Sequence, residues 1–109
     1  MARLTLDAGE HPDEPEALWA VADVLCVACG GHAGDAASMA RVAMFAAATQ
    51  IALGAHPSYP DRAGFGRTTM ALAPAAIADA VGAQCAQLAR VAARLGRTVA
   101  YVKPHGALY

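Results

Sequence analysis

Four short apolar runs, separated by segments of helical pattern, constrain the fold of this chain more than any other feature. The runs are Leu4–Leu6, Val24–Cys29, Ile51–Ala55 and Val99–Val102, and Gly, Pro, Asp or Lys residues follow them. Apolar runs that alternate with helical segments are typical of parallel strands joined by crossover helices. We therefore predict an α/β fold with the element order β-α-β-α-β-α-β.

The segments between these runs carry helix start and stop signals. Pro74 begins the clearest helix, because its fixed φ suits a first helical turn and its missing N–H is not needed there. Gly96 ends that helix. Asp35 is placed to cap a helix over 36–49, and the short segment 17–22 is also compatible with a helix.

Length and composition indicate one domain, residues 1–109, and exclude several classes of function. The net charge of −1 and the 16% of charged residues exclude a strongly basic nucleic-acid-binding module. Asp23 interrupts the longest apolar stretch, so we expect no membrane span, and the first residues lack the pattern of a signal peptide. We therefore expect a cytoplasmic protein with no nucleic-acid partner and no membrane contact.

The cysteines agree with a reducing compartment. There are three of them, an odd number that cannot form a closed set of disulfides. Cys26 and Cys29 form one C-x-x-C, but no second Cys or His pair stands at zinc-finger spacing. We therefore expect neither a zinc-finger nor a redox role for this pair.

Histidines and acidic residues recur where the predicted strands end. The carboxyl ends of parallel strands lie on one face of the fold, where ligand sites form. Lys103, the only lysine, stands two residues before a histidine and shares a strand face with it if the extended conformation continues. We expect six residues to meet in one cleft: Asp7, Glu10, His32, His56, Lys103 and His105.

Two kinds of chemistry are open to such a cluster. Neutral imidazoles and carboxylates can hold a divalent metal that activates water. Alternatively, a His or Asp serves as general base while Lys103 stabilises developing negative charge. Spacing alone does not choose between the two, so the metal ligands stay undetermined.

Two loops offer further binding groups. The turn Gly30–Asp35 enters a helix and could bind an anion, but it lacks the Walker A and dinucleotide patterns, so the sequence shows no nucleotide site of its own. The segment 58–69 is rich in Pro, Gly, Asp and Arg and is expected to be irregular. Its Arg62 and Arg67 can bind a carboxylate through paired hydrogen bonds.

Three long motifs, in this order, resemble those of the LamB/YcsF family. They are ACGGHAGD at 28–35, GAHPSYPD at 54–61 with GFGR at 64–67, and VKPHGALY at 102–109. The segment LTLDAGE at 4–10 is similar to a degraded form of the family's opening motif, so the resemblance covers essentially the whole chain. It implies an irregular seven-stranded (β/α)7 barrel of the glycoside hydrolase/deacetylase type. This chain would then be a truncated, partial barrel that supplies the first four strands.

The same resemblance implies an activity and partners. The family is the A subunit of the ATP-dependent 5-oxoprolinase, which opens the lactam of 5-oxoproline to L-glutamate together with B and C subunits. ATP would then act with the partner subunits. The six clustered residues would be catalytic, and we expect four further motif residues to bind the small-molecule substrate: Asp35, Ser58, Tyr59 and Arg67.

The chain departs from the family pattern on its first two strands. Thr5 and Cys26 stand where the family usually has asparagines, Gly31 replaces an aromatic residue, and the segment 10–24 is shorter than usual. Family members are also more than twice as long. Two alternatives therefore stay open: a metal-dependent, deacetylase-like hydrolase of a carbohydrate amide, and an inactive half-barrel that acts only by association through exposed strand edges.

Overall fold

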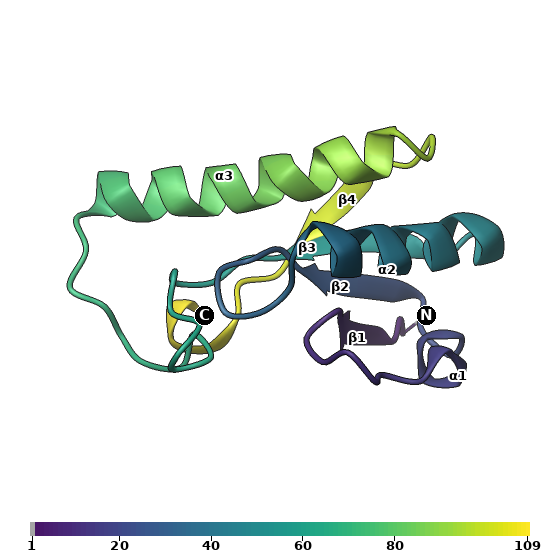
Figure 1. The fold of residues 1–109 in the computed structure, drawn as a ribbon, viewed down its shortest axis with the longest axis horizontal. Coiled ribbons are helices and arrows are strands. Elements are labelled where there is room, and N and C mark those ends of the chain that lie inside the picture. Colours follow the sequence, from purple (N-terminus) through teal and green to yellow (C-terminus); the bar gives the residue numbers. More distant parts are fainter. Residues whose placement is uncertain (1) are drawn as a thin grey trace.

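The protein forms one four-stranded parallel sheet with its two long helices on the same face (Figure 1). The computed structural model describes residues 2–109. The elements in chain order are β1 (Thr5–Ala8), α1 (Glu16–Trp19), β2 (Val24–Ala28), α2 (Ala36–Thr49), β3 (Ala52–His56), α3 (Pro74–Ala93), β4 (Val99–Val102) and the 3-10 turn η1 (Gly106–Leu108).

Each strand pairs with the next one along the chain, so the sheet order is β1-β2-β3-β4 and all pairs are parallel. One row of partners runs from Asp7 through Cys26 and Gly54 to Tyr101. The β3–β4 pairing shifts register at Gly54. These pairings confirm the predicted α/β fold with parallel strands.

The two edge strands approach each other across the sheet face that α2 and α3 leave uncovered. The guanidinium Nη1 of Arg3, just before β1, donates to the hydroxyl of Tyr101 in β4 at 2.6 Å. Nearer the carboxyl ends, Lys103 Nζ lies 2.7 Å from an oxygen of Asp7. Side chains from the first and last strands of a flat sheet could not meet, so the sheet is strongly curved.

The hydrophobic core lies between the sheet and the two long helices. β2 is buried along its whole length because it has a strand on either side and α2 over one face. Helix α2 turns a stripe of small and medium side chains toward the sheet with the spacing of one helix face. The buried members of this helix are Met39, Val42, Ala43 and Ala46.

Helix α3 is buried over only part of its length. Among its residues, Gln84, Leu88 and Ala92 are buried, whereas Ile77 and Val81 are only partly covered. The first turns of α3 extend beyond the ends of the strands, as Figure 1 shows, so no sheet lies beneath them.

Two strand boundaries differ from the predicted ones in a way that matters for the site. β1 continues to Ala8, so Asp7 lies on the strand and not after it. β3 includes His56 as its last residue. Helix α1 is limited to Glu16–Trp19, shorter than the predicted segment 17–22.

The two cysteines of the C-x-x-C lie in different surroundings. Cys29 belongs to the core under the helices, and burial raises the pKa of its thiol to about 12. The Sγ of Cys26 lies beside Gly54, 3.4 Å from where a Cβ at that position would be. Separately, within residues 2–109 no helix combines the length and the apolar character that a membrane crossing requires.

Gly34 allows the tight turn from β2 into α2, and its replacement tests this junction. Its φ is +87°, and an added Cβ would lie 2.6 Å from the carbonyl oxygen of Ala28. We expect Gly34→Ala to lower the free energy of unfolding by about 1–3 kcal/mol, measured by urea denaturation. Gly82→Ala is the matched control, because Gly82 lies inside α3 with nothing within 4 Å of an added Cβ.

The control change should raise stability by roughly 0.5–1 kcal/mol, since alanine loses less backbone entropy than glycine in a helix. Equal stability of the Gly34→Ala protein and the unchanged protein would show that the turn is not held in this conformation.

Candidate active site at the carboxyl ends of the strands

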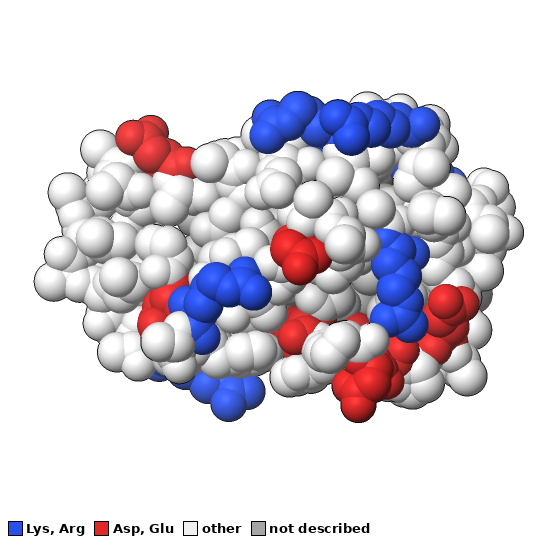
Figure 2. Space-filling model, in the orientation of Figure 1, with Lys and Arg blue, Asp and Glu red and all other residues white. Residues whose placement is uncertain are grey.

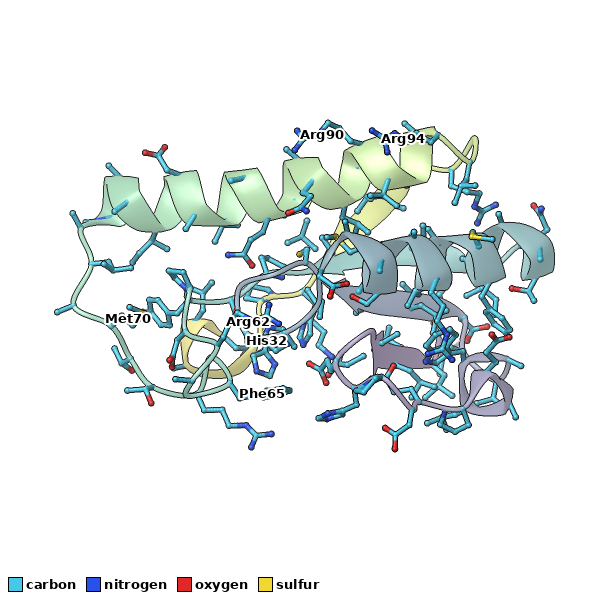
Figure 3. The ribbon with its side chains drawn as sticks, viewed as in Figure 1. His32, Arg62, Phe65, Met70, Arg90 and Arg94 are labelled. Carbon is cyan, nitrogen blue, oxygen red and sulfur yellow. The ribbon has the colours of Figure 1, made fainter. Side chains whose placement is uncertain are left out.

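All six residues predicted to be catalytic meet at the carboxyl ends of the four strands. β1 and the turn after it supply Asp7 and Glu10, the turn after β2 supplies His32, and β3 ends on His56. In Figure 3, His32 lies below the strand ends, close to Phe65 of the long loop before α3. The side chains of Glu10, His32, His56 and His105 each offer a donor atom within 4.8 Å of the others.

Hydrogen bonds that extend the β3–β4 pairing place the last two residues of the cluster. The amide of Lys103 donates to the carbonyl of Ala55 at 2.9 Å, and the amide of His105 donates to that of Pro57 at 2.8 Å. The chain therefore stays extended beyond β4. Both side chains reach the same cluster, as their spacing predicts.

Glu10 is the carboxylate at the centre of the histidines. Its Oε2 lies 2.6 Å from His32 Nε2, and 3.8 Å from both His56 Nε2 and His105 Nδ1. Burial raises the pKa of Glu10, but the hydrogen bond and charge of His32 outweigh it, so the pKa lies below its usual value. The turn is held by Glu14, whose carboxylate accepts from the Glu10 amide at 2.9 Å.

Asp7 and Lys103 form an ion pair at the open side of the cluster. Lys103 Nζ lies 2.7 Å from Asp7 Oδ1, and His56 Nε2 lies 3.4 Å from Asp7 Oδ2. The contact with His56 lowers the pKa of Asp7 strongly; burial opposes this, and Lys103 lowers it further. Burial alone would lower the pKa of Lys103, but Asp7 raises it above its usual value. Both groups are therefore charged at neutral pH.

In each histidine of the cluster, one ring nitrogen faces Glu10 and is called the inner nitrogen. The other, called the outer nitrogen, has a fixed partner. His56 Nδ1 lies 2.6 Å from the carbonyl of Lys103, and His105 Nε2 lies 2.8 Å from the carbonyl of Phe65. Carbonyl oxygens only accept hydrogen bonds, so both of these ring nitrogens carry the proton. The partner of the third histidine is a hydroxyl group, because His32 Nδ1 lies 3.0 Å from Ser58 Oγ.

The loop residues Phe65 and Gly66 cover the histidines, and sequence reasoning did not single them out as site residues. The ring of Phe65 lies edge-on to His32 and His105, with ring centroids 5.0 and 5.2 Å apart. Phe65 has φ +52° and Gly66 has φ +67°. A Cβ at Gly66 would lie 2.9 Å from His32 Cβ, so this position needs glycine. The signal in the sequence was the Gly-Phe-Gly of the second motif.

Gln84 and Ser58 support His32 from behind. Gln84 accepts from the amide of Ser58 at 3.0 Å and donates to its carbonyl at 2.8 Å. Glu10, His32 and Ser58 thus form a hydrogen-bonded chain like that of serine hydrolases. However, Ser58 has no exposed surface and its hydroxyl donates to the Tyr59 carbonyl at 2.9 Å. Ser58 is therefore a positioning residue in this arrangement.

The four residues expected to bind substrate lie around the cluster at different depths. Ser58 and Tyr59 are buried behind the histidines. Asp35 caps α2, where its carboxylate accepts from the Ser38 amide at 2.8 Å. Arg67 is exposed, with its guanidinium 5.0 Å from the centre of the Phe65 ring.

A pocket of about 460 Å³ opens beside Glu10. Its other walls include Asp35, Arg41 and Arg62. Arg62 donates to the carbonyls of Gly30 and Gly34, which fixes it at the pocket rim. Figure 2 shows charges of both signs scattered over this face of the molecule.

Comparison with known proteins decides the family. A sequence model described as the LamB/YcsF family matches residues 7–109. The chain belongs to the LamB/YcsF family. This confirms the resemblance carried by the three long motifs, each of which contributes a histidine to the cluster.

Relatives of this LamB/YcsF chain are longer than it is. The 5-oxoprolinase A subunit of Streptomyces avermitilis is 46% identical over 100% of this chain and 46% of its own length. The 5-oxoprolinase A subunit of Pseudomonas putida that carries the number 2 is 48% identical over 80% of this chain and 34% of its own. The crystal structure of the Lactam Utilization Protein from Thermus thermophilus matches with a TM-score of 0.94 and 34% identity, over 99% of this chain and 46% of that one. The chain thus spans less than half the length of these relatives.

The charge coupling between Asp7 and Lys103 can be measured directly. In Lys103→Met, the pKa of Asp7 should rise because one of the groups that stabilise its charge is removed. It should stay below 3.8, because the larger effect of His56 remains. A titration of the carboxyl carbon by NMR measures both values.

Arg94→Met is the matched control for this titration. Arg94 lies on the outer side of α3, with Arg90, as Figure 3 shows. Loss of this cation should leave the titration of Asp7 unchanged. An unchanged Asp7 pKa in Lys103→Met would contradict the ion pair.

Proposed function

We propose that this chain acts as the N-terminal part of the A subunit of an ATP-dependent 5-oxoprolinase, whose strand-end cluster takes part in opening the 5-oxoproline lactam to L-glutamate. The main support is that the family motifs place two carboxylates, three histidines and the only lysine in one cluster. Relatives named as A subunits of 5-oxoprolinase share 46–48% identity with the chain. The complex, in this proposal, is cytoplasmic and includes B and C subunits.

The exposed members of the cluster are the ones that would meet the lactam. Asp7 and Lys103 have side-chain exposures of 34% and 38%, whereas the side chain of His32 has 0%. Lys103 would stabilise negative charge on the lactam oxygen as water adds to the carbonyl carbon. Asp7 would accept the proton of that water. The ring C–N bond then breaks as protonated Asp7 passes this proton to the nitrogen, which leaves as an amine.

The ion pair links these two roles. While Lys103 is paired with Asp7, it helps to keep the pKa of the carboxyl low, which makes Asp7 a weak base. When the ammonium turns to the substrate oxygen, Asp7 loses part of this stabilisation and becomes more basic. The base would thus gain strength only with substrate in place.

The remainder of the barrel and the use of ATP are assigned to other parts of the complex. Four parallel strands in chain order, with both long helices on one face, are the arrangement with which a β/α barrel begins. We propose that they are the first four of seven. A lactam in a five-membered ring is stable, so its opening needs coupling to ATP, and this would take place with the partner subunits.

The experiment is a glutamate assay with the A subunit that contains this chain, B and C subunits from the same source, 5-oxoproline and ATP. Lys103→Met should lower kcat by about 10²–10³-fold, as does loss of an oxyanion-stabilising group. Asp7→Asn should lower it by roughly 10²–10⁴-fold. Arg94→Met should be unaffected.

Other outcomes would select other functions. Glutamate formation by the chain alone without ATP would contradict the coupled mechanism. Release of acetate from an N-acetylated sugar, with no reaction of 5-oxoproline, would favour the deacetylase-like alternative. A folded chain inactive with both partners would favour the half-barrel that acts only by association.

A further inference from the structure

The inner nitrogens of His56 and His105 face each other at a distance at which either a shared proton or a metal ion can join them. His56 Nε2 and His105 Nδ1 are 3.1 Å apart. Their other nitrogens already donate protons to the backbone carbonyls of Lys103 and Phe65. In the neutral rings both inner nitrogens therefore present a lone pair. Two lone pairs at this distance repel each other unless a proton or a metal ion lies between them.

Glu10 supplies the third donor at the same point. Its Oε2 is 3.8 Å from each of these two nitrogens. Ligand atoms around a tetrahedral zinc ion with bonds of about 2.0–2.1 Å are separated by about 3.3 Å. The separations of 3.1, 3.8 and 3.8 Å lie close to that value. Small movements of the side chains would complete the coordination.

His32 is near this point but is not oriented as a ligand together with His105. The two rings are stacked, with centroids 3.6 Å apart and planes within 12°. An ion bound in the plane of one ring would lie far out of the plane of the other. His32 instead contacts Glu10 at 2.6 Å and Ser58 at 3.0 Å. A histidine in this arrangement does not bind the metal itself but holds a metal-binding carboxylate in position by a hydrogen bond.

We propose that Glu10, His56 and His105 bind one divalent metal ion of the zinc class, and that His32 holds Glu10 in position. Two imidazoles and a carboxylate with a further position open are typical of catalytic zinc. Such an ion polarises a carbonyl group or lowers the pKa of a bound water. The binding is inferred from the donor geometry alone; a part for the ion in lactam opening rests on the proposed function.

Zn²⁺ titration of the chelator-treated, dialysed chain by calorimetry tests the site. We expect one Zn²⁺ per chain. His56→Gln and His105→Gln should each weaken binding by at least about 100-fold, and His32→Gln by about 10–100-fold, the usual effect of an outer partner. His11→Gln is the matched control, because His11 is an exposed histidine outside the donor set, and it should bind like the unchanged protein.

A second measurement needs no variant and decides the matter if the variants fail to fold. In histidine side-chain NMR of the unchanged protein, Zn²⁺ should shift Nε2 of His56 and Nδ1 of His105. The protons on their outer nitrogens should remain. Circular dichroism shows which variants are folded.

Absence of stoichiometric Zn²⁺ binding would overturn the proposal, and so would undiminished binding in folded His56→Gln and His105→Gln. The histidine pair would then share a proton in place of a metal. Neither assay contains 5-oxoproline or partner subunits. If the protein binds zinc but does not open the lactam, the proposed function alone is wrong. If the protein opens the lactam but binds no zinc, the metal site alone is wrong.

Discussion

The site depends on two backbone hydrogen bonds that keep the chain extended beside β3 after β4 has ended. They join the amides of Lys103 and His105 to the carbonyls of Ala55 and Pro57. The same extension turns the Lys103 carbonyl toward the ring of His56. One short stretch of backbone therefore places a cation and a histidine and fixes the proton position of a second histidine. If it were displaced, Asp7 and Glu10 would face an incomplete cluster.

Short sequence signals predicted those features of the fold that depend on neighbouring residues. The helix over 36–49 begins where predicted because its capping box, formed by Asp35 and Ser38, lies within its own first turn. The convergence of the six polar residues was also predictable, because it follows from parallel strand order and not from side-chain detail. The sequence thus specifies the elements and the face on which a site can form.

The rest depends on contacts between distant parts of the chain. The burial of α3 depends on how far the sheet reaches beneath it. The depth of Ser58 depends on Gln84, which is 26 positions away along the chain. Space beside Gly31, where the family usually has an aromatic residue, is filled here by Ser58 and Gln84. The missing aromatic side chain is thus replaced in the packing by two neighbouring side chains.

The contact between Arg3 and Tyr101 joins residues 98 positions apart and, with the Asp7–Lys103 pair, ties the two edge strands together over the concave face. The curvature of the sheet is therefore set within these four strands. A further strand pairing with β4 would add to an arc whose radius is already defined. A longer relative is synthesised from its N-terminus onward. Its first four strands would then form a curved sheet to which the later strands add.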